Sequence, residues 1–270
     1  MIELTVALPL FRAKYIAWLA LESLCLQKGV NFEWELVIAE ETDSVYFPLN
    51  QEEVIKYEER LKSVGCTRIK YIPLKKWIPL AKKWKLIADN SSAESQTFIL
   101  QPADGFSHPN RLKVANDLIL SGADWVHSKI YVFYYLKNKS IYMLDRDHFI
   151  LPSGKKHSCG IDMATRTEYA KKLPNEARKK GVDSWFYNNC RSFSIKKKSK
   201  FNPVWDKSDN WKYSLTVHGI NNISNFENFF GKKGFNKSNI NIKEFIPHYI
   251  IDRLDNEART YALNWKRFVK

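Results

Sequence analysis

The amino-acid sequence predicts an α/β fold with a mostly parallel central sheet flanked by helices. In the first half, short apolar runs alternate with amphipathic stretches, which is typical of strand–helix units. The chain has 270 residues, of which 44% are hydrophobic and 27% are charged, so it can bury a large core and is not disordered. No run approaches the roughly 18 apolar residues that a membrane-spanning helix needs.

The expected elements of the first half follow one another in regular order. Apolar runs predict buried strands at residues 5–10, 36–39, 67–72 and 97–100. Apolar residues at helical spacing predict helices at residues 14–27, 51–64 and 79–88, and a further helix that begins at Pro109. This alternation favours a parallel sheet buried on both faces.

The second half changes character. Residues 125–136 and 141–144 predict a small antiparallel hairpin, and residues 214–218 predict a short late strand. Short helical patterns occupy residues 167–172 and 183–189. The expected fold therefore combines a parallel sheet with a small antiparallel addition.

The C-terminal tail has the clearest helical pattern. From Ile246 to Phe268, apolar residues recur at steps of three or four, which predicts an amphipathic helix. The polar face of this helix carries acids as well as bases. We therefore expect the helix to pack on the body of the protein rather than lie on a membrane.

Net charge and cysteine content give weaker indications of function and location than the strand and helix patterns give of the fold. The formal net charge is +14, and a basic surface attracts polyphosphates such as nucleic acids. The excess of lysine over arginine, with many Asn and Ile residues, is also the composition that an AT-rich genome produces. The cysteines are scattered, with no Cys-x-x-Cys pair, so we expect reduced thiols, no structural zinc and a cytoplasmic location. The N-terminus, with Glu3 before its apolar run, does not resemble a secretory signal.

Acidic residues follow two of the expected strands. Glu40 and Glu41 close one strand, and Asp104 follows another in a turn with Pro102 and Gly105. Ligands of open parallel sheets bind at the carboxyl ends of the strands. A carboxylate in such a turn is well placed to bind a divalent cation that carries phosphate oxygens, although Asp104 could equally serve only to start the turn.

Several motifs, in order along the chain, resemble one enzyme family. Residues 98–112, FILQPADGFSHPNRL, resemble the strand, acidic turn and Pro-x-Arg-Leu helix start of inverting nucleotide-sugar glycosyltransferases of family 2, which have the GT-A fold. Matching segments are the first strand with its proline (5–11), a Ser-Leu-x-x-Gln helix motif (23–27), LVIAEETD (36–43), the acidic helix start GVDSWF (181–186) and a late strand end with His218 (217–224). The resemblance spans about residues 5–224.

The resemblance implies a GT-A domain at residues 1–230 with a packed helical extension at 231–270. Within the domain, residues 1–122 would form the donor-binding half and residues 123–230 the acceptor-binding half. The family transfers a sugar from a nucleotide-diphosphate donor, here most simply a UDP-sugar, to a hydroxyl of a glycan or glycoconjugate.

The resemblance also implies roles for individual acids. Asp104 corresponds to the last acid of the family's Asp-x-Asp, which holds Mn²⁺ or Mg²⁺, and His218 corresponds to the histidine that can complete the metal or diphosphate site. Pro102 stands at the earlier acidic position of this motif, and Gly105 replaces a further frequent acid. One carboxylate of the motif therefore remains, and the sequence does not decide whether it binds a metal tightly. Asp183 corresponds to the general base; its alternative role is a helix N-cap.

Binding residues follow from the same resemblance. The implied donor site consists of Pro9, Phe11, Arg12, Glu40, Glu41, Lys82, Lys83 and Asp104. Glu40 and Glu41 could instead be a solvated strand end, and Lys82 and Lys83 a solvated helix face. The implied acceptor residues are His157, Asp162 and Arg166, each of which could also be surface structure. Basic runs at 171–172, 178–180 and 196–200 could meet an anionic glycan, a lipid-linked acceptor at a membrane surface, or solvent.

Other function classes remain to be weighed. A P-loop, a Gly-x-Gly dinucleotide fingerprint and a Gly-x-Ser-x-Gly elbow are absent. A nucleic-acid-binding or nucleotidyl-transferring protein is supported by the net charge and the many aromatic residues, but most of these aromatics fall in expected strands and helix stripes. A GT-A fold that binds sugars without catalysis is the third class. We expect a glycosyltransferase without specific nucleic-acid binding.

Overall fold

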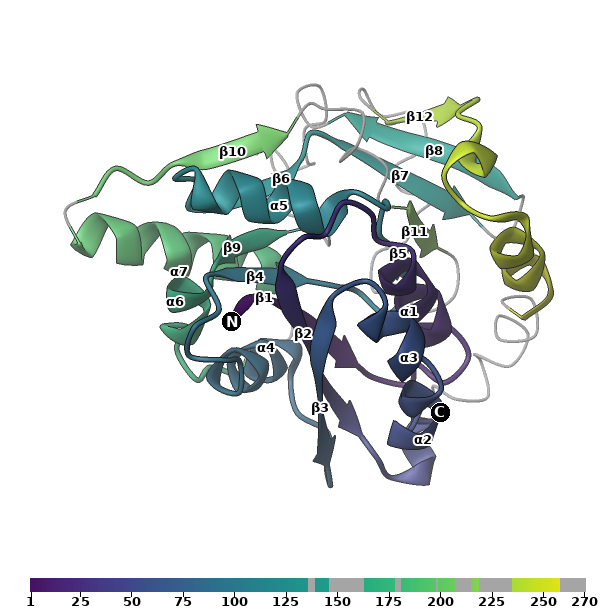
Figure 1. The fold of residues 1–270 in the computed structure, drawn as a ribbon, viewed down its shortest axis with the longest axis horizontal. Helices are drawn as coiled ribbons and strands as arrows, with labels where there is room; N and C mark the ends of the chain where they lie inside the picture. The colour runs from purple at the N-terminus through teal and green to yellow at the C-terminus, as the bar shows by residue number, and fades with distance from the viewer. Residues whose placement is uncertain are drawn as a thin grey trace.

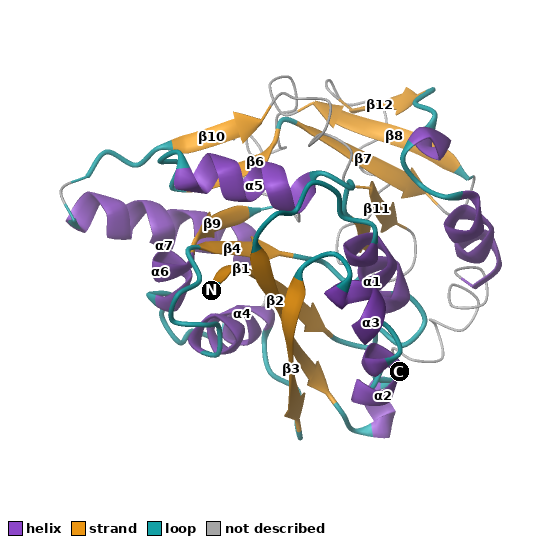
Figure 2. Ribbon diagram, viewed as in Figure 1, coloured by secondary structure: helices purple, strands orange, loops and turns teal. Residues whose placement is uncertain are grey.

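The predicted α/β fold with a mostly parallel central sheet is confirmed by a computed structural model. The structure describes residues 1–135, 139–145, 163–177, 181–197, 199–206, 215–218 and 235–257. Helices cover both faces of the central sheet, and a second sheet lies at one end of it (Figures 1 and 2).

The central sheet has seven strands in the order β10-β6-β9-β4-β1-β2-β3. The strands are β1 (Ile2–Leu10), β2 (Glu33–Glu41), β3 (Cys66–Leu74), β4 (Thr97–Leu100), β6 (Trp125–Ser128), β9 (Ala164–Arg166) and β10 (Pro203–Asp206). All neighbours pair in parallel except β9, which is antiparallel to β4 and β6. The carboxyl ends of β1, β2 and β4 therefore lie at one edge of the sheet, as the sequence predicted.

The helices divide between the two faces of this sheet. They are α1 (Ala17–Cys25), α2 (Gln51–Ile55), α3 (Glu58–Lys62), α4 (Leu80–Asp89), α5 (Arg111–Leu120), α6 (Thr167–Lys171) and α7 (Val182–Lys196). Side chains of β1 and β2 alternate between two cores: Val6 and Leu36 pack with α1, α2, α3 and α5, whereas Ala7 and Val37 pack with α4, α6 and α7. Both faces are buried, which explains the nearly continuous apolar runs of these strands.

The second sheet is mostly antiparallel, with the order β12-β8-β7-β11-β5. Its strands are β5 (Gly105–Phe106), β7 (Ile130–Tyr135), β8 (Ser140–Asp145), β11 (Leu215–His218) and β12 (Phe235–Ser238). The predicted hairpin is present as β7 and β8. Strand β5 directly follows the acidic turn, so this sheet begins beside Asp104.

Part of the C-terminal tail is helical at residues 248–257, and residues 258–270 lie outside the described ranges. Ile246, Ile250 and Leu254 are buried in the core that contains α1. The hydroxyl of Tyr249 donates a hydrogen bond to Glu22 at 2.9 Å, so this part of the tail is bound to α1 by polar as well as apolar contacts.

Two expected elements differ from those observed. Residues 51–64 form the separate helices α2 and α3 rather than one helix. Residues 125–136 were expected to form one strand, but β6 pairs with β10 in the central sheet and β7 pairs with β8 in the second. Local propensity cannot reveal this change of sheet, because it depends on partners distant in sequence.

Candidate active site

A cavity of about 260 Å³ lies at the carboxyl ends of β1 and β4. It collects residues from the β1–α1 loop, the start of α4, the acidic turn and the first turn of α7. Its described lining is Pro9, Phe11, Leu80, Trp84, Leu100, Gln101, Pro102, Ala103, Asp104, Met163 and Asp183. The structure thus brings Pro9, Phe11, Asp104 and Asp183 together, although they lie far apart in the sequence.

The acidic turn is fixed by buried polar side chains. The Gln101 side-chain amide donates to the carbonyl of Gly105 at 2.8 Å and closes the turn around Asp104. Arg111, which is 1% exposed, donates to the Gln101 side-chain oxygen at 2.7 Å and to the Leu100 carbonyl at 2.6 Å. A buried guanidinium with several acceptors holds its neighbours firmly, so Asp104 is presented by a rigid turn.

Gly105 is needed for close packing in this turn. A Cβ atom at this position would lie 2.4 Å from Cγ of Pro102, which is less than any normal contact. Gly105 stands where the family that the sequence resembles often has an acid, and close packing against Pro102 gives a steric reason for the glycine in this chain.

The Asp104 carboxyl is partly buried in the cavity. Burial raises its pKa to about 6, because desolvation disfavours the charged form. A cation or a ligand proton donor beside Asp104 would stabilise the carboxylate that burial destabilises.

Asp183 lies in the first turn of α7 and is partly buried at the cavity. The N-cap of this helix is Gly181, with φ of 60°, and Asp183 lies two residues beyond it. The alternative role of Asp183 as the N-cap residue is therefore wrong. Its position at the N-terminus of a helix, where the dipole is positive, favours a carboxylate there.

His218 is described through its backbone only, as the last residue of β11. Strand β11 pairs antiparallel with β5, with Thr216 opposite Gly105. Asp104 precedes Gly105 by one position, and His218 follows Thr216 by two. His218 therefore ends its strand two residues beyond the pair with Gly105, so its backbone lies on the side of the acidic turn.

The cavity has few candidate metal ligands. Within the described ranges, no group of three or more His, Cys, Asp or Glu side chains is arranged to hold a metal ion. Asp104 and Asp183 are the acids of the described cavity lining. Mg²⁺ is commonly held by one or two carboxylates together with substrate phosphates. The donor set therefore fits a cation that enters with a diphosphate.

The loop after β1 presents an aromatic ring to the cavity. Phe11 is 36% exposed and its ring centroid lies 5.8 Å from that of Tyr46. The guanidinium carbon of Arg12 lies 5.2 Å from the Phe11 centroid, and Lys83 Nζ lies 5.3 Å from it. Arg12 has φ of 52°, in the left-handed region, and so turns the chain directly after Phe11. The ring is held in place by two cations.

Lys83 and Glu41 form a buried ion pair beneath this loop. Their side chains are 3% and 0% exposed. Lys83 also donates to the carbonyl of Leu10, and Glu41 accepts a hydrogen bond from the backbone NH of Ile78 at 3.2 Å. The ammonium of Lys83 and the carboxylate of Glu41 are therefore paired with each other inside the protein. Neither residue is part of the described cavity lining.

Glu40 is also turned inward. Its carboxylate accepts hydrogen bonds from the backbone NH groups of Leu49 and Asn50 at 2.7 and 3.1 Å, and from the Tyr71 hydroxyl at 2.6 Å. Burial raises the pKa of this carboxyl against the opposing effect of these bonds. Glu40 therefore anchors the chain after β2, and the structure does not bring it into the cavity.

The remaining predicted residues lie outside the described lining. Lys82 is partly buried on α4. Arg166, at the end of β9, donates to Asp124 at 2.8 Å, which is a structural contact. His157 and Asp162 fall outside the described residues, although Met163, the next residue after Asp162, lines the cavity.

Sequence reasoning missed several residues of the cavity. Leu80 and Trp84 reach it from α4, and Gln101 and Met163 from the ends of β4 and β9. Trp84 follows Leu80 by one helical turn, a spacing that could have shown that both lie on one face of the helix. The contribution of Met163 depends on the position of β9, which its short sequence does not indicate.

No protein-family model matches this sequence, and no match was found among curated proteins. Solved structures do match. S. aureus TarS 1–349 in complex with UDP matches over 81% of this chain, with a TM-score of 0.57 and 14% identity. The same fragment in complex with UDP-GlcNAc matches over 80%, with a TM-score of 0.58 and 14% identity. The mannosyltransferase PcManGT from Pyrobaculum calidifontis, in complex with GDP-Man and Mn²⁺, matches over 81%, with a TM-score of 0.50 and 13% identity.

These matches establish the fold. The chain has the GT-A fold of nucleotide-sugar glycosyltransferases, which confirms the prediction. It spans 61% of the TarS fragment and 57% of PcManGT. Within the described part of the chain, none of the helices has the length and apolar character needed to cross a bilayer.

Proposed function

We propose that this protein is an inverting glycosyltransferase that transfers a sugar from a nucleotide-diphosphate donor, most simply a UDP-sugar, to a hydroxyl of a glycan or glycoconjugate. The observation that carries the proposal is the cavity at the carboxyl ends of β1 and β4. It gathers an exposed aromatic ring and two carboxylates on a fold shared with nucleotide-sugar glycosyltransferases.

The donor would lie with its base against the β1–α1 loop. Phe11 offers a flat ring to the base, and Pro9 shapes the adjoining wall. Arg12 and Lys82 stay candidates for contacts with the ribose or diphosphate. Glu41 and Lys83 would act on the donor indirectly, by holding the loop that carries Phe11, and Glu40 by holding the loop after β2.

Asp183 would act as the general base. Its carboxylate would take the proton of the acceptor hydroxyl while that oxygen forms a bond to the anomeric carbon. The bond from the anomeric carbon to the diphosphate oxygen breaks on the opposite face, so the configuration inverts. The bonding electrons leave with the nucleoside diphosphate.

Asp104 would hold a Mn²⁺ or Mg²⁺ ion, with His218 as a second ligand. When bound, such an ion neutralises the charge that develops on the departing diphosphate. The rigid turn built by Gln101 and Arg111 would keep Asp104 in position for this contact.

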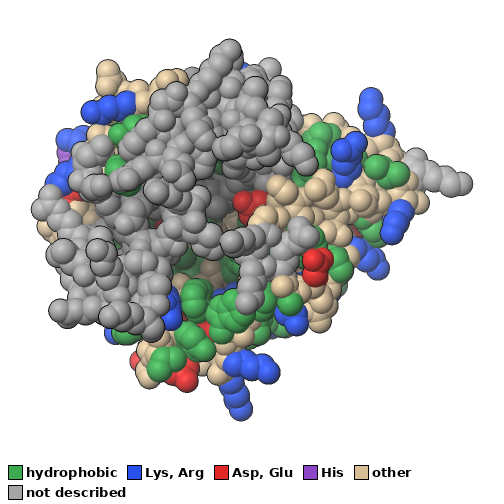
Figure 3. Space-filling model, turned by 180° about the vertical axis from the view of Figure 1, so that it is seen from behind, with side chains coloured by type: hydrophobic (Ala, Val, Ile, Leu, Met, Phe, Trp, Pro, Cys, Tyr) green, Lys and Arg blue, Asp and Glu red, His purple; other side chains and the backbone are tan. Residues whose placement is uncertain are grey.

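The acceptor is proposed to be a glycan, free or linked to lipid or protein. His157 and Asp162 stay acceptor candidates. On the face shown in Figure 3, the visible Lys and Arg side chains lie around the outline rather than in one patch. A peripheral contact with a membrane surface and a cytoplasmic location stay predictions.

A sugar-binding protein without turnover is the second candidate. It is favoured by Pro102 at the earlier acidic position and by the small number of acids in the described cavity lining. Release of UDP from a panel of UDP-sugars with Mn²⁺ would decide between the two. Steady UDP release is expected from a transferase. Binding of UDP without release of UDP from any UDP-sugar would favour the sugar-binding protein without turnover. Retention of a labelled single-stranded nucleic acid at moderate salt, without UDP binding, would favour a nucleic-acid-binding protein.

A further inference from the structure

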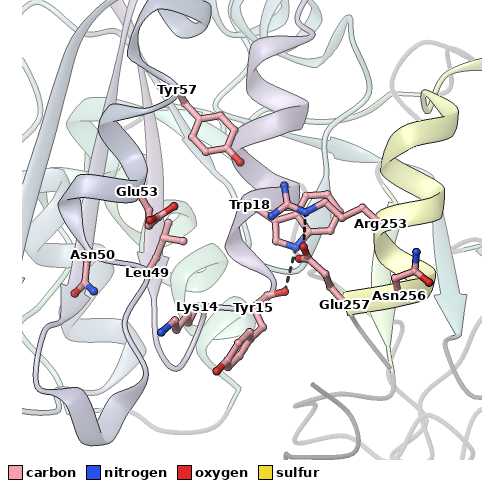
Figure 4. Close-up of a pocket in the computed structure, with 10 residues that line it drawn as sticks. All are labelled: Lys14, Tyr15, Trp18, Leu49, Asn50, Glu53, Tyr57, Arg253, Asn256 and Glu257. Carbon is pink, nitrogen blue, oxygen red and sulfur yellow. Dashed lines mark hydrogen bonds and ion pairs between the residues drawn. The ribbon is translucent and has the colours of Figure 1, made fainter. Parts of the chain in front are cut away.

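A second and larger cavity, of about 640 Å³, lies between α1, α2 and the helical residues 248–257. Figure 4 shows Glu53 and Tyr57 on one side and Arg253 and Glu257 on the other. The described residues that line it do not overlap with those of the donor cavity. Its volume lies within the range of about 300–1,000 Å³ that is usual for small-ligand sites.

Aromatic rings form part of its walls. Tyr15 and Tyr57 are partly buried at the cavity, so each ring contributes a flat apolar surface with a hydroxyl at its tip. The Trp18 ring is covered by the Arg253 guanidinium, whose central carbon lies 4.1 Å from the ring centroid. Flat apolar faces next to hydrogen-bonding groups suit the C–H faces and hydroxyls of a pyranose ring.

The charged groups of the cavity are balanced. Lys14 and Arg253 are opposed by Glu53 and Glu257. Arg253 is bound to Glu257 at 2.8 Å, and Glu53 is bound to Lys56 at 2.6 Å. A phosphate or other anion would need an excess of cations. Balanced charges, together with amide groups such as that of Asn256, suit a neutral ligand with many hydroxyls.

The walls are held by the surrounding structure. The chain at Leu49 and Asn50 is fixed by the buried carboxylate of Glu40. On the opposite side, Tyr249 donates to Glu22, and Glu22 is bound to Arg60 at 2.7 Å. A cavity with walls fixed in this way is preformed, so a ligand would lose little binding free energy in ordering it.

The cavity adjoins the donor site through one loop. Phe11 lines the donor cavity, whereas Lys14 and Tyr15, a few residues further along, line the second cavity. The backbone NH of Lys14 donates to the carbonyl of Phe47 at 3.1 Å and ties this loop to the chain after β2. A saccharide bound here would therefore lie beside the loop that holds the nucleotide.

From this geometry we propose that the cavity between α1, α2 and residues 248–257 is a binding site for neutral saccharide units of the glycan acceptor, away from the hydroxyl that receives the sugar. The identification of the bound glycan as acceptor rests on the proposed function. Binding of the saccharide itself does not.

Saturation-transfer NMR and calorimetry of the full chain test the proposal. The probes are cellotriose and triacetylchitotriose, with inorganic phosphate as the anionic comparison. We expect at least one trisaccharide to bind with a Kd of about 1 mM and phosphate not to compete with it. Tyr57→Ala and Asn256→Ala should each weaken saccharide binding about tenfold and leave the affinity for UDP within about twofold. Tyr142→Ala, in the second sheet, is the matched control and should change neither.

Several outcomes would overturn the proposal. These are no binding of either trisaccharide, competition by phosphate, or saccharide binding that is unchanged in both cavity variants. Asn256→Ala gives the answer if Tyr57→Ala fails to fold. UDP release by the wild type without acceptor is measured in parallel. Failure of saccharide binding with intact UDP release would overturn this site alone, and saccharide binding without UDP release would overturn the proposed transferase alone.

Discussion

The buried ion pair of Lys83 and Glu41 allows a quantitative prediction for Lys83→Met. The pair is almost completely excluded from solvent, with side-chain exposures of 3% and 0%. Removal of the Lys83 ammonium leaves the Glu41 carboxylate buried without its charged partner. The backbone NH of Ile78 still donates a hydrogen bond to it. Breaking a buried pair in this way costs about 3–5 kcal/mol. We therefore expect Lys83→Met to lower the free energy of unfolding by about this amount.

Urea unfolding followed by tryptophan fluorescence measures the effect. Lys82→Met is the matched control on the same helix, and we expect it to change the free energy of unfolding by no more than about 0.5 kcal/mol. The double variant Glu41→Leu with Lys83→Met should recover to within about 1 kcal/mol of the wild type, because an apolar pair has no charge to desolvate. A loss below about 1 kcal/mol in Lys83→Met, or no recovery in the double variant, would refute the reasoning.

Other predictions concern the acidic turn and the thiols. In Gly105→Ala, the new Cβ would collide with Pro102, so calorimetry should show UDP affinity reduced about tenfold; unchanged affinity would contradict the role of the turn. Because burial raises the pKa of Asp104 to about 6, its carboxylate is lost as the pH falls through that value, and Mn²⁺-dependent UDP binding should weaken there. Asp104→Asn should remove this pH dependence, and a wild-type affinity that rises on acidification would be the opposite of the expectation. Burial raises the pKa of the Cys25 and Cys66 thiols to about 12, so iodoacetamide at neutral pH should leave both unmodified until urea is added, as peptide mass mapping would show.

The sequence was sufficient to predict β1, β2, β3 and β4 of the central sheet, and of these β1, β2 and β4 are largely buried on both faces, whereas β6 was assigned to the hairpin and β10 was not expected. Strands β1, β2 and β4 contain continuous apolar runs at residues 6–10, 36–39 and 98–100, and their carboxyl ends lie together as expected. Strand β9 was missed because it has three residues and is held by pairing with β4 and β6. Pairing of this kind is a tertiary property that a short segment does not encode locally.

In the candidate site, too, the sequence predicted the local features and missed those that depend on tertiary contacts. The motif at residues 98–112 correctly indicated an acidic turn followed by a helix, and the structure supplies its physical basis in the contact between Gln101 and Arg111. Glu40 and Glu41 end a strand, and the family resemblance implied that they contact the donor. Their side chains instead bind Leu49, Asn50, Ile78 and Lys83, partners that only the folded chain brings near.

The most direct test of the proposed transferase compares wild type with Asp183→Asn. Calorimetry gives the affinity for UDP with Mn²⁺, and UDP release from the preferred UDP-sugar gives the rate. We predict a UDP affinity within about threefold of the wild type and a rate reduced by about 10²–10⁴, the usual contribution of a general base. A rate close to that of the wild type in Asp183→Asn would contradict the assignment of Asp183 as the base.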